Sequence, residues 1–195
     1  MLIWIIENYI EIFAALTGFV YIYFSINEKI WLWPWGIATS LFLTIVFFTS
    51  KFYADMGLQV YYVIISIYGW AHWAGKGKDI EGEGLPVIKL NFSLGLKLLI
   101  ITSLIFFLIS FLLIRFTDSP LPYWDSFTTS LSIVATWMLA RKYIEQWLIW
   151  ILIDFVSTGL YIYRELYITA ILMTVYGILA VVGFRVWQKS MKVQE

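Results

Sequence analysis

Cysteine is absent from the 195-residue chain, and histidine occurs once, at His72. Without cysteine the chain can form no disulfide, bind no iron–sulfur cluster and use no thiolate nucleophile. A single histidine also argues against a histidine-based metal site. We therefore predict no metal site and no cofactor.

Charge is scarce as well. Only 13% of the residues are charged, and 13 Lys and Arg balance 13 Asp and Glu. A chain of zero net charge has no electrostatic footprint for nucleic acid. The sequence also lacks a Walker A motif, a G-x-S-x-G elbow and an H-E-x-x-H pair. Asp125 and Asp154 could suggest a membrane aspartyl protease, but they lie on separate predicted segments at different depths. We predict a protein that is not an enzyme, has no catalytic residues and binds no nucleic acid.

What the chain has in excess is apolar surface. Hydrophobic residues make up 62%, aromatic residues 20%, and the mean hydropathy is +0.83. A soluble domain of this size cannot bury so much apolar area, so we predict an integral membrane protein with lipids as its surroundings. The first residues, MLIWIIENYIEIF, contain no basic stretch and carry Glu7 and Glu11. They are not expected to form a cleaved signal peptide.

Seven segments are apolar and long enough to cross a bilayer. They are residues 8–26, 31–49, 55–74, 97–115, 123–141, 146–164 and 167–187. The longest polar connection, GKGKDIEGEGLPVIKLNF, runs from Gly75 to Phe92. Its glycines, charges and Pro86 mark it as a linker between two halves. The predicted fold class is therefore an all-α membrane protein with seven transmembrane helices.

The two halves repeat each other at an offset of 114 residues, without a gap. The matching pairs are Glu11–Asp125, Trp33–Trp147, Ser40–Asp154, Tyr53–Tyr167, Leu58–Leu172, Tyr62–Tyr176, Gly69–Gly183 and Trp73–Trp187. One extra helix between two three-helix repeats gives both repeats the same orientation in the membrane. We predict a first bundle over residues 1–75, a cytoplasmic linker loop over 76–96, a linking transmembrane helix over 97–116, and a second bundle with a cytoplasmic tail over 117–195.

The distribution of lysine and arginine predicts the orientation. With seven spans, one side holds ten basic residues: Lys29, Lys76, Lys78, Lys89, Lys97, Arg141, Lys142, Arg185, Lys189 and Lys192. The other side holds Lys51, Arg115 and Arg164. Because basic residues concentrate on the cytoplasmic side, we expect the C-terminus in the cytoplasm and the N-terminus outside.

A stripe on the sixth segment carries the strongest functional signal. Trp147, Trp150, Asp154, Ser157 and Tyr161 are three or four residues apart, which places them on one helix face. A carboxylate at membrane depth is costly unless it faces a cavity, a partner or a ligand. Indole rings attract cations and stack on flat rings. The stripe predicts one wall of a site for a flat, cationic small molecule. The alternative is that Asp154 only pairs with a neighbouring Tyr or Thr and joins two helices.

Polar faces of the other segments add further candidates. The predicted substrate-binding residues are Trp33, Ser40, Gln59, Tyr62, Thr136, Trp147, Trp150, Asp154 and Tyr176. Structural alternatives remain open for several of them. Trp33 and Trp147 could be interface anchors, and Gln59 and Tyr62 could be interhelical hydrogen-bond partners. The paired glycines of the third and seventh segments are interpreted as packing points rather than hinges.

Several sequence blocks together are similar to one known family. They are W-P-x-G at Trp33, YADM-x-LQ at Tyr53, YGW-x-x-W at Tyr68, DS-F-TT at Asp125 and W-x-x-W at Trp147. Over nearly the whole chain the sequence resembles PnuC-type vitamin transporters. The resemblance implies a three-plus-one-plus-three helix fold like that of SWEET sugar transporters, and a homotrimer in the bacterial inner membrane. It also implies facilitated import of nicotinamide riboside, which a separate cytoplasmic kinase then traps by phosphorylation.

The chain departs from the family pattern at one position that matters. Nicotinamide riboside members of the family often carry Asn where this chain has Asp154. Relatives proposed to carry thiamin belong to the same family, and both vitamins contain a flat cationic ring that a carboxylate would suit. We expect a small cationic aromatic vitamin, with nicotinamide riboside first and thiamin as the alternative. A sugar transporter, a membrane-embedded enzyme and a purely structural subunit are weaker alternatives.

Overall fold

The computed structural model describes residues 9–49, 53–76, 85–163, 165 and 167–194. The start of the chain with Glu7, the charged part of the predicted linker loop that includes Lys78, and the basic residues Lys51 and Arg164 lie outside the described residues. The side chains of Glu11 and Asp55 lie outside them as well.

Seven α-helices account for most of the described residues, which form no β-sheet. The helices are α2 (Tyr9–Ile26), α3 (Leu32–Thr49), α4 (Tyr53–Lys76), α5 (Phe92–Phe116), α6 (Pro122–Ala140), α7 (Gln146–Tyr163) and α8 (Tyr167–Gln194). In length and composition, α5, α7 and the Thr169–Lys192 part of α8 could each cross a membrane, and Ala15–Ile26 and Leu32–Val46 are shorter apolar helical stretches. The predicted all-α membrane class is confirmed.

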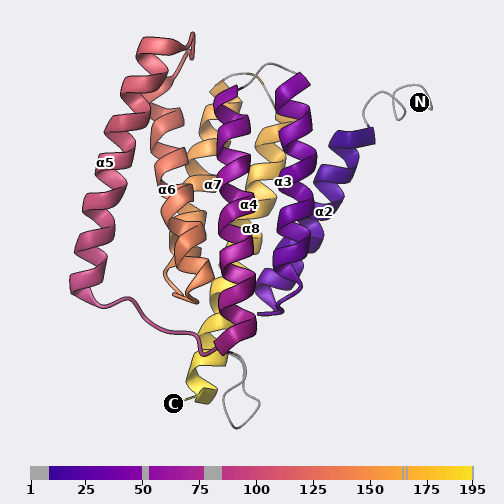
Figure 1. Cartoon of the computed structure of the whole chain (residues 1–195), viewed down its shortest axis with the longest axis vertical. Coiled ribbons are helices and arrows are strands. Elements are labelled where there is room, and N and C mark those ends of the chain that lie inside the picture. Colours follow the sequence, from indigo (N-terminus) through magenta and orange to yellow (C-terminus); the bar gives the residue numbers. More distant parts are fainter. Residues whose placement is uncertain (1–8, 50–52, 77–84, 164, 166, 195) are drawn as a thin grey trace. The chain divides into compact units, whose positions relative to one another are not determined.

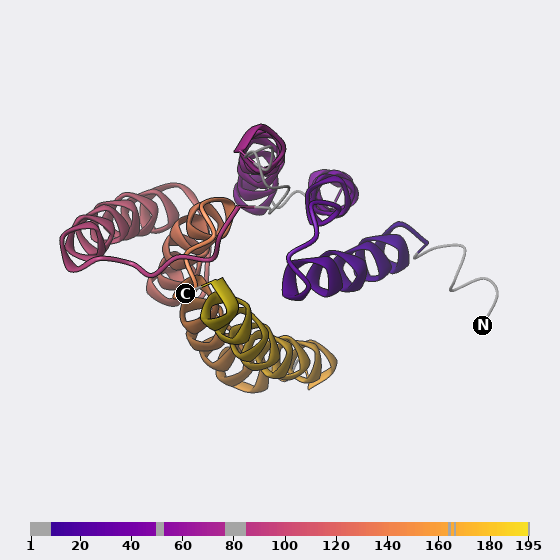
Figure 2. The same cartoon turned by 90° about the horizontal axis from the view of Figure 1, so that it is seen from below.

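The first compact unit comprises Met1–Pro86 and contains α2, α3 and α4. Helix α3 packs against both α2 and α4 and lies between them in both views (Figures 1 and 2). Helix α3 is therefore the middle helix of this unit, and its residues meet both neighbours. Pro34 lies in the first turn of α3, where its missing N–H removes no helical hydrogen bond.

The second compact unit comprises Val87–Glu195 and contains α5 to α8. Helix α6 lies between α5 and α7, and α7 packs against α8 (Figure 1). Leu98 of α5 joins Val134 and Met138 of α6 in a small buried cluster. The opposite face of α5 leaves large apolar side chains such as Leu104 and Phe107 exposed, as a lipid-facing helix does.

The turn between the first two helices of the repeat has the same backbone conformation in both units. Glu28 has φ 54° and Lys142 has φ 57°, a left-handed conformation that commonly ends a helix. The amide of Lys29 donates to the carbonyl of Phe24 at 2.9 Å, and the amide of Tyr143 donates to the carbonyl of Met138 at 3.0 Å. Each residue named in the first turn lies 114 positions before its counterpart in the second turn. The repeat seen in the sequence is therefore also a repeat of backbone geometry.

A second repeated feature packs two tryptophans over a glycine. The rings of Trp33 and Trp73 meet edge to face at 5.4 Å, and those of Trp147 and Trp187 at 5.7 Å. A Cβ atom on Gly69 would lie 2.3 Å from the Trp33 ring, and one on the equivalent glycine of α8 would lie 2.6 Å from the Trp147 ring. Only glycine leaves room for the indole, which confirms that these glycines are packing points.

A short extended segment distinguishes the second unit. The amide of Ile88 donates to the carbonyl of Lys142, and the amide of Ile144 donates back to the carbonyl of Ile88, both at 3.0 Å. The amide of Leu90 donates to a carboxylate oxygen of Glu145 at 3.0 Å. The residues that lead into α5 are therefore bonded to the turn between α6 and α7.

We expect Gly69→Ala and Gly183→Ala each to lower the free energy of unfolding by about 1–3 kcal/mol, because the added methyl overlaps a tryptophan ring. Gly57→Ala and Gly159→Ala are matched controls, since a Cβ at either position meets no atom within 4 Å. Thermal unfolding of the detergent-purified variants measures the effect. Equal melting temperatures in the two pairs would contradict the packing role.

Candidate functional site

Asp154 lies in the middle of α7 and is buried, with 7% of its surface exposed. Gly177 of α8 faces it, because a Cβ on that glycine would lie 3.4 Å from the Cβ of Asp154. The phenol of Tyr176, the preceding residue on α8, lies within electrostatic range of the carboxyl group. The structure thus brings two of the predicted site residues, Asp154 and Tyr176, together where α7 meets α8.

The hydroxyl group of Thr158 is bonded to the backbone of α7 and not to this carboxylate. Thr158, one turn further on, donates its hydroxyl hydrogen bond to the backbone carbonyl of Asp154 at 2.8 Å. Its oxygen also lies 3.5 Å from the hydroxyl of Thr174 on α8. The threonine pair therefore joins the two helices through the backbone and leaves the carboxylate to other partners.

Trp150 precedes Asp154 by one helical turn on the same face of α7. It is half-buried, unlike the neighbouring Trp147, of which 3% is exposed. On α6, Thr136 is buried and donates its hydroxyl to the carbonyl of Ser132 at 2.8 Å. The hydroxyl oxygen of Thr136 can still accept a hydrogen bond, whereas its hydrogen is already donated to the backbone.

Trp33 and Trp147 lie in the interior of their own units. Trp33 is fully buried, and each of the two indole N–H groups lacks a hydrogen-bond partner among the described residues. Each ring rests on a glycine and meets a second tryptophan. Their surroundings favour a packing role, and their predicted contact with substrate remains a prediction.

The predicted residues of the first unit lie on α3 and α4. Ser40 and Gln59 are buried, and Tyr62 is half-buried beside Tyr61, with ring centroids 5.8 Å apart. Both units thus contribute hydroxyl, phenol and indole groups to the predicted set, whereas the amide comes from the first unit and the carboxylate from the second.

Tyr21 of α2 was not among the predicted site residues. A Cβ on Gly36 would lie 3.1 Å from two carbons of the Tyr21 ring and 3.3 Å from the hydroxyl oxygen of Ser66. Tyr21 also lies within electrostatic range of Tyr62. At the offset of 114 residues Gly36 aligns with Trp150, so the sequence shows a glycine in the first unit where the second unit has an indole.

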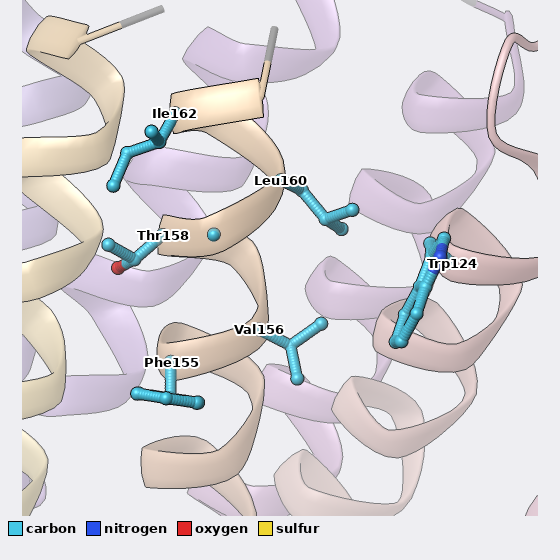
Figure 3. A pocket seen from close by; sticks show the side chains of 7 residues that line it. Trp124, Phe155, Val156, Thr158, Leu160 and Ile162 are labelled. Atoms are coloured by element: carbon cyan, nitrogen blue, oxygen red, sulfur yellow. The ribbon is translucent and has the colours of Figure 1, made fainter.

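A hollow of about 450 Å³ on α7 does not fit a polar ligand. It is lined by Trp124, Phe155, Val156, Thr158, Gly159, Leu160 and Ile162. Figure 3 shows Val156 and Leu160 pointing towards Trp124 of α6. Its single hydroxyl, on Thr158, is bonded to the backbone, and Phe155 is 79% exposed. The hollow contains none of the predicted site residues and has the character of a lipid-facing surface.

Comparison with known proteins gives one consistent family. The family described as nicotinamide mononucleotide transporter matches residues 8–189. A protein named nicotinamide riboside transporter PnuC, from Escherichia coli (strain K12), is 28% identical over 94% of this chain and 86% of its own length. The riboflavin/roseoflavin transporter RibM of Streptomyces davaonensis is 23% identical over 91% of this chain and 83% of its own length.

A solved structure shows the same fold. The crystal structure of the vitamin B3 transporter PnuC superimposes with a TM-score of 0.77 at 23% sequence identity. The match covers 99% of this chain and 86% of that one. The chain therefore has the fold of that structure, and its family is one of transporters and not of enzymes.

Replacing either packed tryptophan tests the role that the structure favours. Trp33→Ala and Trp147→Ala should each lower the free energy of unfolding by about 3–5 kcal/mol, because each leaves a large cavity in a helix interface. Trp31→Ala, at a residue that is 60% exposed, is the control and should unfold like the original protein. Thermal unfolding in detergent measures all three. A normal melting temperature for Trp147→Ala would overturn the packing role.

Proposed function

Because the chain belongs to the nicotinamide mononucleotide transporter family, we propose that it imports nicotinamide riboside across a bacterial inner membrane. The name of the Escherichia coli relative supports this substrate, and so does the chemistry of α7. Nicotinamide riboside is a flat cationic ring with a hydroxylated sugar. A site for it needs an anion, an aromatic face and hydrogen-bonding groups.

The observation that carries the proposal is the buried Asp154 carboxylate one turn from the half-buried Trp150. A carboxylate at membrane depth gains most from a cationic partner, and an indole face attracts the same cation. Gly177 of the facing helix presents no side chain to the Cβ of Asp154. In the proposed complex, Asp154 balances the pyridinium charge, and Trp150 and Tyr62 are the aromatic residues assigned to the ring.

Three further predicted residues serve the ribose in this proposal. Gln59, Ser40 and Thr136 are buried polar groups on three different helices. Transporters built from repeats bind substrate near the midplane between the repeats and expose it by rocking one repeat against the other. We assign this chain a three-plus-one-plus-three, SWEET-like arrangement with alternating access, supported by the 114-residue offset. Uptake is facilitated diffusion, and a cytoplasmic kinase then traps the riboside by phosphorylation.

The same charges favour the riboside over its phosphorylated form. Helices α2, α3, α6 and α7 contain no Lys or Arg. A phosphate brought near Asp154 would be repelled, and these helices offer no cation to receive it.

The ten basic residues on one side support a cytoplasmic C-terminus and an outside N-terminus. A homotrimer follows from the resemblance to PnuC-type transporters.

Thiamin is the second candidate, because its thiazolium ring offers the same flat cation to Asp154. The isoalloxazine ring of riboflavin is neutral, so the carboxylate does not favour it, although one relative carries the name of a riboflavin transporter. A neutral sugar would leave the buried charge without a partner. The carboxylate thus separates cationic vitamins from neutral ligands, and a direct comparison has to separate the two vitamins.

Calorimetric titration of the purified protein with nicotinamide riboside, thiamin and riboflavin side by side tests the proposal. We expect nicotinamide riboside to bind most tightly, and Asp154→Asn to weaken it by about tenfold or more as the charge pairing is lost. Asp125→Asn is the matched control. That carboxylate accepts a hydrogen bond from Ser119 at the N-terminal end of α6 and should not affect affinity. Unchanged affinity in Asp154→Asn would remove Asp154 from the site.

The preference for the unphosphorylated vitamin is tested in the same instrument. Nicotinamide mononucleotide should bind about tenfold more weakly than the riboside, or not at all, because of repulsion between its phosphate and Asp154. Neutral nicotinamide serves as the control for the ring alone. Equal affinity for the mononucleotide and the riboside would be incompatible with the proposed placement of Asp154.

A further inference from the structure

Three basic residues lie at the end of the second unit where α5 begins and where α6 turns into α7 (Figure 1). They are Lys89, Lys97 and Arg141. Among the described residues, none of the three has an ion-pair partner. The acidic residue of the turn, Glu145, accepts a hydrogen bond from the amide of Leu90 at 3.0 Å. This end of the unit therefore presents positive charge that the described part of the chain does not pair.

Two aromatic rings hold the side chain of Arg141. Its guanidinium carbon lies 5.6 Å from the centre of the Trp137 ring, and the Trp137 ring stacks on Tyr143 with centroids 6.1 Å apart. The Nε atom of Arg141 is buried and has no hydrogen-bond partner among the described residues. A stacked guanidinium keeps its fork of N–H groups for an acceptor, and that fork matches carboxylate or phosphate oxygens. Arg141 is therefore positioned to bind an anionic group from outside the described chain.

The extended segment before α5 fixes Lys89 beside the same turn. The residues on either side of it, Ile88 and Leu90, are hydrogen-bonded to the turn at 3.0 Å. The side chain of Lys89 is exposed. Lys142, in contrast, is buried and engaged within the chain, so it is not counted with the available cations. The backbone bonds thus make Lys89 and Arg141 parts of one fixed region of the unit.

The third basic residue, Lys97, begins an exposed apolar stripe on α5. The next residue, Leu98, packs on the last turns of α6 in the buried cluster, which places this part of α5 beside the end of α6. The exposed side chains of Ile101, Leu104 and Leu108 follow Lys97 at intervals of four, three and four residues. That spacing puts them on one helix face. A cationic end with an exposed apolar stripe beyond it is complementary to a phospholipid that carries negative charge.

From this arrangement we propose that the second unit binds an anionic phospholipid between the start of α5 and the turn from α6 to α7. Arg141 binds the headgroup phosphate, Lys89 and Lys97 flank the headgroup, and the acyl chains lie along the stripe of α5. Basic residues at the ends of membrane helices attract anionic headgroups in this way. The site is separate from the proposed substrate site, because it contains none of the residues predicted to bind the vitamin.

The first unit lacks the equivalent arrangement. At the offset of 114 residues, Arg141 aligns with Asn27 and Trp137 aligns with Tyr23. The side-chain amide of Asn27 is neutral and donates to the carbonyl of Tyr23 at 2.8 Å. Helix α5 belongs to the second unit alone, so the first unit has no counterpart of Lys97 or of the apolar stripe. We therefore expect one such lipid site per chain.

Thermal unfolding of the detergent-purified protein with added dioleoyl phosphatidylglycerol or dioleoyl phosphatidylcholine tests the proposal. The anionic lipid should raise the melting temperature and the zwitterionic lipid, which has the same acyl chains, should not. The lipid concentration at half of the shift gives an apparent affinity. Arg141→Gln should weaken that affinity by about fivefold, as expected for the loss of one basic residue at an anionic headgroup.

Lys89→Gln and Lys97→Gln, at exposed residues, should each weaken the affinity for the anionic lipid to a similar degree, and they keep the proposal testable if Arg141→Gln does not fold. Arg115→Gln is the matched control. Arg115 lies in the last turn of α5, on the same face as Lys97 and at the opposite end of the helix. This variant should bind the anionic lipid like the original protein.

Four results would overturn the proposal. Equal shifts with the two lipids would show that headgroup charge is not recognised. An equal loss of affinity in Arg115→Gln would indicate general attraction of charge and no defined site. If inorganic phosphate alone reproduces the shift, the site binds a free anion and the lipid assignment is wrong. If the melting temperature rises with protein concentration and does not respond to lipid, a second copy of the chain covers the stripe.

Discussion

The close contact of a tryptophan ring with a glycine on the facing helix is the interaction on which each unit depends. Between membrane helices the lipid is as apolar as the side chains, so association relies on close packing over small residues. Trp33 over Gly69 holds α3 to α4, and Trp147 over Gly183 holds α7 to α8. A second tryptophan meets each ring edge to face. These two contacts fix the helix pairs that carry most of the candidate site.

Fixing α7 against α8 in this way also determines where the carboxylate lies. Asp154 comes two turns after the packed Trp147, and the small Gly177 of α8 stands opposite it. The packing keeps the aspartate away from the exposed face that carries Phe155. A charge that would be costly in lipid is therefore held inside the unit, beside a tyrosine and one turn from a half-buried tryptophan.

The two units share a backbone plan and differ in their chemistry. The α2–α3 and α6–α7 turns each have a left-handed residue at the equivalent position and the equivalent hydrogen bond, and the α6–α7 turn is also bonded to residues 88 and 90. Among the predicted site residues, the carboxylate of Asp154 comes from the second unit and the amide of Gln59 from the first, whereas hydroxyl, phenol and indole groups come from both. The one charged group that the proposed function assigns to a cationic ring therefore belongs to the second unit.

The sequence by itself determined the helices, the membrane class and the repeat. Apolar length predicts spans well because every backbone group in a bilayer must be bonded within a helix. The 114-residue spacing predicted which residues are equivalent, and Asp154 stood out because a carboxylate is rare at that depth. Spacing could not tell which aromatic residues face a neighbouring helix, because the sides that face lipid are as apolar as the sides that pack against helices. Only the tertiary structure showed that Trp147 fills a glycine-lined interface and that Tyr21 lies over Gly36. Those contacts depend on which small residue a facing helix presents, and that is decided by packing between segments far apart in the chain.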